Sequence, residues 1–406
     1  MRKINTQSFI RATRSTPRKI NRQIILNLVR EHQPISRADL ARQMRVGRGM
    51  VTSLINDLLD EGAIYEGAAV DAPRGRRPKM LFVRTHDRLA VAVDLRFSRA
   101  YLALTDFGGR PVAIETFDTI VDPTALVAEL GRRIRRLTKA HRATGECLGI
   151  GLVVPGMVDH DSGRVINAPQ LGWRNVDIRD ALAKAARLPV QIENAPIACA
   201  LAHMWLGKTG VHMPRDFVYV TVSDGVGAGV VVNGEVVRGH GNTAGEFGHV
   251  PIDPDGPECL CGSRGCLEAF TSNLATLSRY LGHAFSPKEA RDLLTASGIT
   301  IDDVIARSQN GDAKAIAALA QTARYLGIGL SMIINTLNPA QIFLGGEIAD
   351  AWPQIEPIVR AALSERTLTA DAAATPIVPE PASSLPRLRG ATALVAAPTY
   401  AAPQVA

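Results

Sequence analysis

The chain has 406 residues, of which 46% are hydrophobic, and its formal net charge is +7. This length predicts two to three domains with sizeable cores. It has no run of 18 or more apolar residues, and no apolar segment follows the basic N-terminus, which argues against a transmembrane helix and a secretory signal. Three of the five cysteines are clustered, which indicates metal binding in a reducing compartment. We therefore expect a cytoplasmic protein.

The positive charge is concentrated at the N-terminus. Residues 1–80 contain 16 Lys and Arg but only 7 Asp and Glu, a net charge of +9, whereas the rest of the chain has a net charge of −2. Such an asymmetry indicates a nucleic-acid partner. A basic tail that only improves solubility is the alternative.

The N-terminal region has the pattern of a small folded domain after a flexible basic arm at residues 1–17. Between Lys19 and Glu31 the apolar residues recur at helical spacing. Ser36, with Asp39 three residues later, predicts the start of a second helix. A third helix follows Gly47, with an inner face of Met50, Val51, Leu54, Ile55, Leu58 and Leu59. Two short strands at 63–66 and 80–83 complete a winged helix-turn-helix over residues 18–84.

In this motif the third helix enters the major groove of DNA. Its exposed face would present Arg45, Arg48, Thr52, Ser53 and Asn56, and the wing would present Arg74, Arg76 and Arg77. Arginines in the wing could contact phosphates or a narrow minor groove. An ordinary helical domain with a solvated basic face is the alternative.

The remainder of the chain predicts an α/β fold with two similar lobes. A strand, an acidic turn, a second strand and a hairpin occur twice, starting near residues 89 and 217. We expect lobe 1 at 85–196, joined by a C-terminal helix at about 384–397, and lobe 2 at 197–383, with a cleft between them. Residues 313–337 predict a buried helix, and residues 398–406 a disordered tail.

A cluster of potential metal ligands lies in lobe 2. His249, Cys259, Cys261 and Cys266 follow the pattern H-x9-C-x-C-x4-C. Three thiolates and one imidazole suit a structural zinc ion, because four protein ligands leave no position open for water. Glycines at 262 and 265 would let the chain fold tightly around the ion. Three reduced cysteines beside a surface histidine are the alternative.

These motifs resemble those of the ROK family of bacterial sugar-responsive repressors and sugar kinases, and the resemblance extends from about Lys19 to Ala396. Its most specific parts are Gly245-Glu246-Phe247-Gly248-His249 and the run from Cys259 to Glu268. Supporting parts are Pro155-Gly156-Met157-Val158-Asp159, Asn338-Pro339 and Gly345-Gly346. The resemblance implies an actin-like, ribonuclease H-like ROK domain, and the N-terminal winged helix-turn-helix is typical of the repressor branch.

The resemblance also implies a sugar pocket beside the zinc loop. Glu246, His249 and Glu268 would contact sugar hydroxyls from one side, and Asn194 from the other. Carboxylates and carboxamides suit this role because each can join two adjacent hydroxyls. His249 could direct one ring nitrogen to zinc and the other to the ligand. Alternatively, Glu246 and Glu268 only support the zinc ligands.

Two departures from the kinase pattern argue against phosphoryl transfer. The position of the catalytic aspartate, after Asn194, holds Ala195, and Glu193 should point elsewhere. A phosphate-loop glycine is replaced by Arg96. We expect a non-enzymatic homodimeric or homotetrameric repressor of carbohydrate metabolism that binds an operator in double-stranded DNA and a sugar or sugar derivative. An ATP-dependent sugar kinase, and a regulator whose ligand is a partner protein, remain as alternatives.

Overall fold

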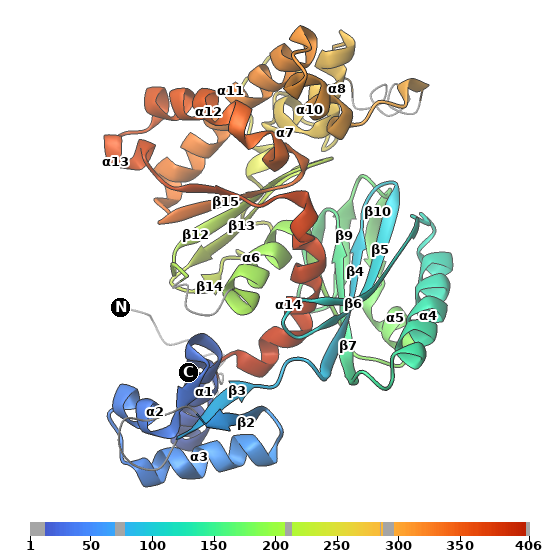
Figure 1. Cartoon of the computed structure of the whole chain (residues 1–406). Helices are drawn as coiled ribbons and strands as arrows, with labels where there is room; N and C mark the ends of the chain where they lie inside the picture. The colour runs from blue at the N-terminus through green and yellow to red at the C-terminus, as the bar shows by residue number, and fades with distance from the viewer. Residues whose placement is uncertain (1–12, 70–77, 208–212, 285, 287–295, 403–406) are drawn as a thin grey trace.

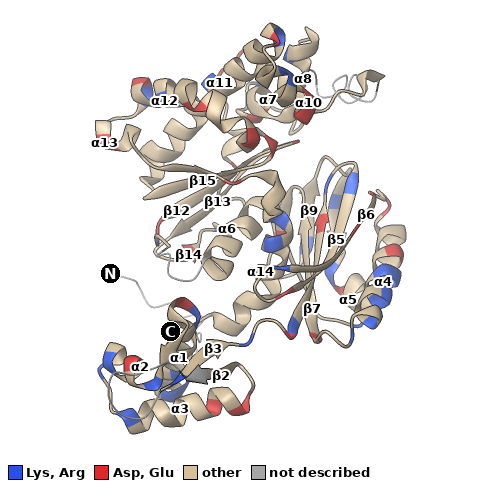
Figure 2. Cartoon of the chain, in the orientation of Figure 1, with Lys and Arg blue, Asp and Glu red and all other residues tan. Residues whose placement is uncertain are grey.

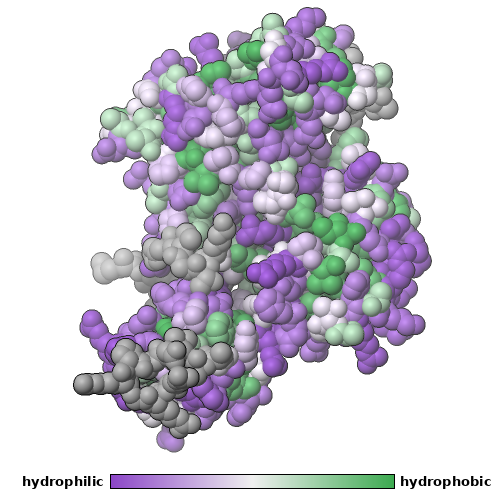
Figure 3. All heavy atoms as spheres, in the orientation of Figure 1, coloured by the Kyte–Doolittle hydropathy of each residue, from purple (hydrophilic) through white to green (hydrophobic). Residues whose placement is uncertain are grey.

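The computed structural model describes residues 13–69, 78–207, 213–284, 286 and 296–402. It consists of an N-terminal unit and two α/β lobes, and the C-terminal helix α14 (Pro386–Tyr400) runs from the space between the lobes to the N-terminal unit (Figure 1). The surface seen in Figure 3 is mainly hydrophilic, because most large apolar side chains are buried in the cores of these three parts.

The N-terminal unit contains three helices and a three-stranded antiparallel sheet of order β1-β3-β2. The helices are α1 (Thr16–His32), α2 (Arg37–Met44) and α3 (Arg48–Asp60), and the strands are β1 (Ile35–Ser36), β2 (Ile64–Ala69) and β3 (Lys79–Val83). Ser36 and Asp39 form the predicted capping box at the start of α2. These are the elements expected of a winged helix-turn-helix, with β1 as an additional strand that the sequence pattern did not reveal.

Two expectations for this unit need correction. Helix α1 already begins at Thr16, with Pro17 in its first turn, where the fixed φ of proline suits a helix start. Residues 16 and 17 are therefore helical and not part of the flexible arm expected at 1–17, of which residues 1–12 lie outside the described part. Met50 is 39% exposed and not part of the inner face, because it lies beside the buried stripe of α3, which consists of Val51, Leu54, Ile55 and Leu58.

Lobe 1 is built on a five-stranded sheet of order β11-β7-β4-β5-β6. Its strands are β4 (Arg88–Leu95), β5 (Arg99–Asp106), β6 (Pro111–Asp118), β7 (Glu146–Val154) and β11 (Val190–Asn194), with helices α4 (Pro123–Ala140) and α5 (Arg179–Ala186). Helix α6 (Ala195–Leu206) follows β11 and leads into lobe 2. A small antiparallel sheet of β8 (Met157–Asp159), β9 (Arg164–Ala168) and β10 (Trp173–Asp177) lies within the lobe.

Lobe 2 repeats the topology of lobe 1. Its sheet of order β14-β13-β12-β15-β16 has antiparallel pairing from β12 to β14 and parallel pairing of β12 with β15 and of β15 with β16. The strands are β12 (Phe217–Val222), β13 (Val226–Val232), β14 (Glu235–Val236), β15 (Gln341–Gly345) and β16 (Ile377–Pro379). Lobe 1 has the same order and the same directions, which confirms the predicted repeat and the two-lobed α/β fold.

Helices and short helical turns cover the sheet of lobe 2 and supply most of its core. They are η1 (Phe247–His249), α7 (Glu268–Thr271), α8 (Asn273–Leu281), α10 (Ile301–Gln309), α11 (Ala313–Leu337), η2 (Glu347–Ala351), α12 (Trp352–Arg366), α13 (Ala370–Ala373) and η3 (Ala382–Ser384). Among the described residues, α11 alone is long and apolar enough by composition to cross a membrane. Its Leu326, Leu330 and Ile333 are each only 1% exposed within the core of lobe 2, as expected for a buried helix.

The end of the chain differs from the expected disordered tail. Helix α14 continues to Tyr400, three residues beyond the predicted end of the C-terminal helix, and Tyr400 is only 3% exposed. It packs in the same apolar cluster as α1, α2 and α3, so burial against the N-terminal unit keeps residues 398–400 helical. Residues 403–406 lie outside the described part.

Candidate metal centre and ligand pocket

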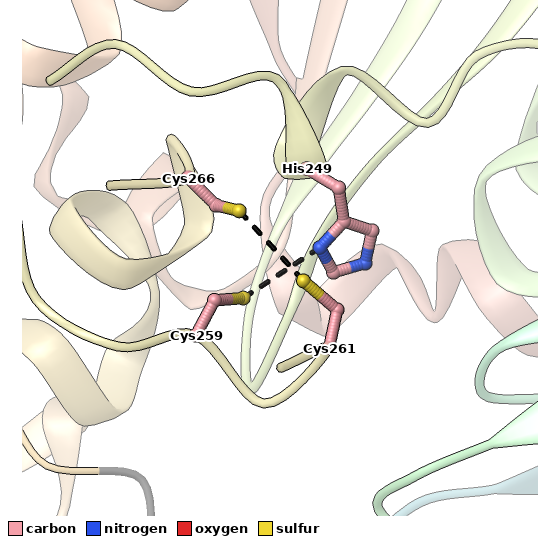
Figure 4. A group of neighbouring side chains, drawn as sticks. All are labelled: His249, Cys259, Cys261 and Cys266. Atoms are coloured by element: carbon pink, nitrogen blue, oxygen red, sulfur yellow. Dashed lines mark hydrogen bonds between the residues drawn. The ribbon is translucent and has the colours of Figure 1, made fainter. Parts of the chain in front are cut away.

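Four side chains with metal-ligand chemistry converge in lobe 2 (Figure 4). His249 ends η1, and Cys259, Cys261 and Cys266 lie on the loop that precedes α7. One ligand atom from each lies within 4.8 Å of all the others. The Sγ atom of Cys259 is 3.6 Å from Nδ1 of His249, and those of Cys261 and Cys266 are 3.7 Å apart. The predicted ligand set is therefore brought together.

Backbone contacts hold the cysteine loop against the segment after η1. The N–H of Ile252 donates to the carbonyl of Gly265 at 2.8 Å, and that of Leu267 donates to Val250 at 3.0 Å. Gly265 has φ +66°, and a Cβ atom there would lie 1.5 Å from the carbonyl oxygen of Asp253. Only glycine fits this close approach, which explains the glycine in the cysteine motif.

The donor set fits a thiophilic ion with tetrahedral coordination. Three sulfurs and one imidazole nitrogen complete four-fold coordination and leave no open position. Burial raises the pKa of the Cys259 thiol and of the Cys266 thiol, so these groups need a nearby cation to remain thiolates at neutral pH. The residues present therefore suit a structural zinc site better than a hydrolytic one.

The group of ligand side chains His249, Cys259, Cys261 and Cys266, called here the metal cluster, lies beside a pocket between the lobes. His249 and Cys261 line this pocket, which is called here the interlobe pocket. It has a cavity volume of about 120 Å³. All four predicted sugar-contacting residues line it, namely Asn194 from lobe 1 and Glu246, His249 and Glu268 from lobe 2. Other lining residues include Arg96, Gln170, Ala195, Asp224 and Arg387. The structure therefore brings Asn194 to the same cavity as the other three residues, although it is far from them in the sequence.

Glu268 links the metal cluster to the pocket. Its Oε2 accepts a hydrogen bond from the Val226 N–H at 2.8 Å, and its Oε1 lies 3.7 Å from the Cys259 sulfur. Glu246 is 3.8 Å from His249 Nε2, while Nδ1 of the same ring faces Cys259. Burial raises the pKa of both glutamates. The ring of His249 thus has one nitrogen toward the metal cluster and the other toward a pocket carboxylate.

The lobe 1 wall is formed where β11 meets α6. Asn194 ends the strand and caps the helix, with its Oδ1 accepting from the Ile197 N–H at 3.1 Å; its side-chain amide nitrogen remains as a donor for a ligand. Ala195 is next to it and offers no proton-accepting group. Glu193 is not among the residues that line the pocket, and its Oε2 lies 2.5 Å from Nη1 of Arg238.

Arg96 belongs to an ion-pair network at the back of the interlobe pocket. Its Nε donates to Asp94 Oδ2 at 2.9 Å, and its Nη1 donates to Glu347 Oε1 of lobe 2 at 3.2 Å. Asp94 is 1% exposed, and its other oxygen is 2.7 Å from Nε of Arg387 on α14. Arg387 was not predicted, since no local motif marks it and only the fold brings it beside Asp94.

The five predicted DNA-contacting residues within the described part all lie on the exposed surface of the N-terminal unit. Arg45 is the C-cap residue of α2, and Arg48, Thr52, Ser53 and Asn56 follow along one face of α3. The predicted wing residues Arg74, Arg76 and Arg77 lie outside the described residues. In Figure 2 basic residues lie around α2 and the start of α3, whereas acidic residues lie near the end of α3, so the start of this helix is better suited to approach DNA.

Two arginines that were not predicted as DNA contacts bind side chains of α3 on this surface. Arg18 of α1 donates to Ser53 Oγ at 3.1 Å and pairs with Asp57 at 2.5 Å. Arg37, the first residue of α2, donates to Asn56 Oδ1 at 3.0 Å. Their basic character was visible in the sequence, but their place beside α3 depends on how the three helices pack.

Comparisons with known proteins agree with this architecture. The xylose repressor of Bacillus subtilis is 29% identical over 354 residues, which cover 86% of this chain and 88% of the repressor. The DNA-binding transcriptional dual regulator NagC of Escherichia coli is 27% identical over 363 residues, which cover 89% and 88%. The crystal structure of a ROK family transcriptional regulator, a homolog of the E. coli MLC protein, superposes with a TM-score of 0.77 and 27% identity over 95% of this chain and 97% of its own. Residues 91–397 match the profile of the ROK family, and the chain therefore belongs to the ROK family.

Proposed function

We propose that this protein is a cytoplasmic, DNA-binding transcriptional repressor whose interlobe pocket binds a sugar or sugar derivative as effector. The observation that carries the proposal is the composition of the pocket: Asn194, Glu246, His249 and Glu268 line it together, while Ala195 stands where a kinase of this family would have its base. The names of the two relatives, a xylose repressor and a transcriptional dual regulator, support a regulator. Because the second relative is a dual regulator, activation of transcription is the alternative to repression.

The pocket chemistry supports binding of a neutral polyol. Glu246 and Glu268 on the lobe 2 wall can accept hydrogen bonds from two adjacent hydroxyls each, and Asn194 can donate from lobe 1. Zinc held by His249, Cys259, Cys261 and Cys266 would be structural. It would fix the position of His249 and, through the Cys259 contact, that of Glu268, so that the lobe 2 wall is preorganised.

The same pocket does not favour an ATP-dependent sugar kinase. A general base contributes about 10²–10⁴-fold in rate, and Ala195 cannot supply it. Arg96 occupies the place of a phosphate-loop glycine and is bound to Asp94 and Glu347, so its side chain stands in the path of a nucleotide phosphate. Two independent changes therefore point to a sensor rather than a catalyst.

DNA recognition is assigned to the N-terminal unit. We propose the boundaries 18–84 for the DNA-binding domain, 85–196 for lobe 1 and 197–383 for lobe 2. Arg45, Arg48, Thr52, Ser53 and Asn56 would meet an operator, with Arg74, Arg76 and Arg77 in the wing. A homodimer or homotetramer would place two such units on a two-fold operator.

A thermal-shift experiment on zinc-loaded protein tests the effector. D-Xylose, N-acetylglucosamine and D-glucose serve as probes, together with their phosphates, because a ligand of the folded state raises its unfolding temperature. We expect at least one to do so in the wild type and to lose its effect in Glu246→Gln. The absence of any shift, together with ligand-independent DNA release by a partner protein, would support a vestigial cleft instead.

Two further assays separate the remaining alternatives. Duplexes selected from a random-sequence pool should bind with an affinity that falls steeply with salt, and a flat salt dependence would refute DNA binding. Incubation with ATP and the same sugars should give no sugar-dependent ADP; measurable turnover would favour the kinase.

A further inference from the structure

We propose that helix α14 transmits the state of the interlobe pocket to the DNA-binding unit, with Arg387 anchoring one end of the helix and Arg30 clamping the other. The inference rests on the proposed function and adds the structural route by which an effector would act. Its basis is a continuous set of contacts from the pocket to α1.

The pocket end of α14 is held by a buried carboxylate. Arg387, in the first turn, has its Nε 2.7 Å from Asp94 Oδ1 and donates from Nη2 to the Leu95 carbonyl at 3.0 Å. Arg96 holds the other oxygen of Asp94 and reaches across the cleft to Glu347. A change in the separation of the lobes would therefore act on Asp94, and through it on Arg387.

The middle of α14 is packed too closely to absorb such a change by bending. A Cβ atom on Gly151 of β7 would lie 1.8 Å from the Ala391 carbonyl oxygen, and one on Gly390 would lie 2.7 Å from the backbone of Ala198 on α6. Thr392 Oγ1 is 2.7 Å from Thr105 Oγ1. Since packed interiors transmit strain rather than absorbing it, the part of α14 from Arg387 to Leu394 should move as one body.

The far end of α14 is gripped by helix α1. Gln23 Nε2 donates to the Thr399 carbonyl and Asn27 Nδ2 to the Tyr400 carbonyl, each at 2.8 Å. The guanidinium of Arg30 lies 5.1 Å from the ring centre of Trp205 and 5.3 Å from that of Tyr400, and its Nη1 donates to the Trp205 carbonyl at 2.9 Å. These contacts fix α1 to α14 and to the end of α6.

Both lobes act on α14, which makes it suited to report their relative position. The helix follows β16 and η3 of lobe 2, and its Arg389 donates to Glu380 Oε1 of that connection at 3.0 Å. Its other side packs on β4 and β7 of lobe 1. A ligand that binds one lobe arrangement better than another shifts the equilibrium between them, and α14 would pass that shift to α1.

Hydrogen exchange on full-length, zinc-loaded protein tests the route without requiring a known effector. In Arg387→Met we expect the amides of α1 (Thr16–His32) to exchange about tenfold faster, while the amides of α11 keep their protection. Arg30→Met, at the other end, should give a similar increase. Arg360→Met is the matched control, because this arginine also joins two elements, α12 and the Thr375 carbonyl at 2.8 Å, but lies in lobe 2 away from α14.

The outcomes distinguish this inference from the proposed function. Unchanged α1 exchange in Arg387→Met, or an equal increase in Arg360→Met, overturns the α14 route. If Arg387→Met loses protection in α11 as well, Arg387→Lys decides: it keeps the charge that faces Asp94 and should restore the protection of α1, and a failure to restore it overturns the route. A sugar among D-xylose, N-acetylglucosamine and D-glucose that raises the unfolding temperature should also alter the exchange of the α1 amides in the wild type. The same sugar should alter this exchange less in Arg387→Met. If none binds, the effector proposal fails while the Arg387 variants still decide the route.

Discussion

Replacing Cys261 by serine is the sharpest test of the metal centre. The Cys261 side chain is exposed, whereas Cys259 and Cys266 are buried. An exposed cysteine contributes little by packing, and surface substitutions of this kind change stability by about 0.5 kcal/mol or less. Any larger loss must therefore come from the loss of a metal ligand.

The expected size follows from the linkage between metal binding and folding. If removal of one of four ligands weakens zinc about 100-fold, the stabilisation by zinc falls by about 2.7 kcal/mol. For a lobe of this size, that corresponds to a drop of about 5–10 °C in the unfolding temperature. Lobe 2 has its own reporter, because Trp352 lies in its core and is 6% exposed.

The assay compares thermal unfolding of the zinc-loaded wild type and Cys261→Ser with and without a chelator. Unfolding is followed by tryptophan fluorescence, to which Trp352 of lobe 2 contributes, and the zinc content is measured. The chelator should lower the unfolding temperature of the wild type by more than that of the variant, because the two proteins differ only in how strongly zinc stabilises them. Cys147→Ser, which alters a cysteine outside the cluster, should behave like the wild type. Equal sensitivity of Cys261→Ser and the wild type to the chelator would refute the assignment.

Three other predictions concern DNA, ligand and pH. Arg48→Ala should reduce the slope of log affinity against log salt by about 1 if this residue contacts a phosphate; an unchanged slope in titrations of a selected duplex would remove it from the interface. Glu246→Gln should weaken the binding of the effector found by thermal shift about 10–100-fold, because hydrogen bonds to charged groups contribute about 1.5–3 kcal/mol. Calorimetry measures this affinity, and an unaltered value would argue that Glu246 only supports the zinc ligands. Glu380 is buried, which alone would raise its pKa, but its contacts with His203 and Arg389 lower the pKa below the ordinary 4.5. The contribution of Glu380 to the free energy of unfolding is therefore fully present above pH 4.5 and is lost as the pH falls through the lowered pKa. The free energy of unfolding should consequently fall less steeply with decreasing pH in Glu380→Gln than in the wild type. Identical pH dependences would contradict this reasoning.

Local sequence patterns were sufficient for the parts of this protein that depend on nearby residues. Helical spacing and the Ser36–Asp39 capping box predicted the helices of the N-terminal unit, since both are governed by contacts within one or two turns. The spacing of His249, Cys259, Cys261 and Cys266 predicted the metal cluster, because a tight loop brings ligands together whatever the surrounding fold. The repeated strand pattern predicted the two lobes.

The tertiary structure alone decided the features that join distant segments. Arg387 beside Asp94, the interlobe ion pair of Arg96 with Glu347, and the clamp of Arg30 on Tyr400 have no local signature, because each depends on how separate elements pack. The same cause corrected the C-terminus: an alanine- and proline-rich tail reads as disordered, but burial of Tyr400 against the N-terminal unit extends α14. Composition determines what a segment prefers in isolation, whereas burial against a distant partner determines what it does in the fold.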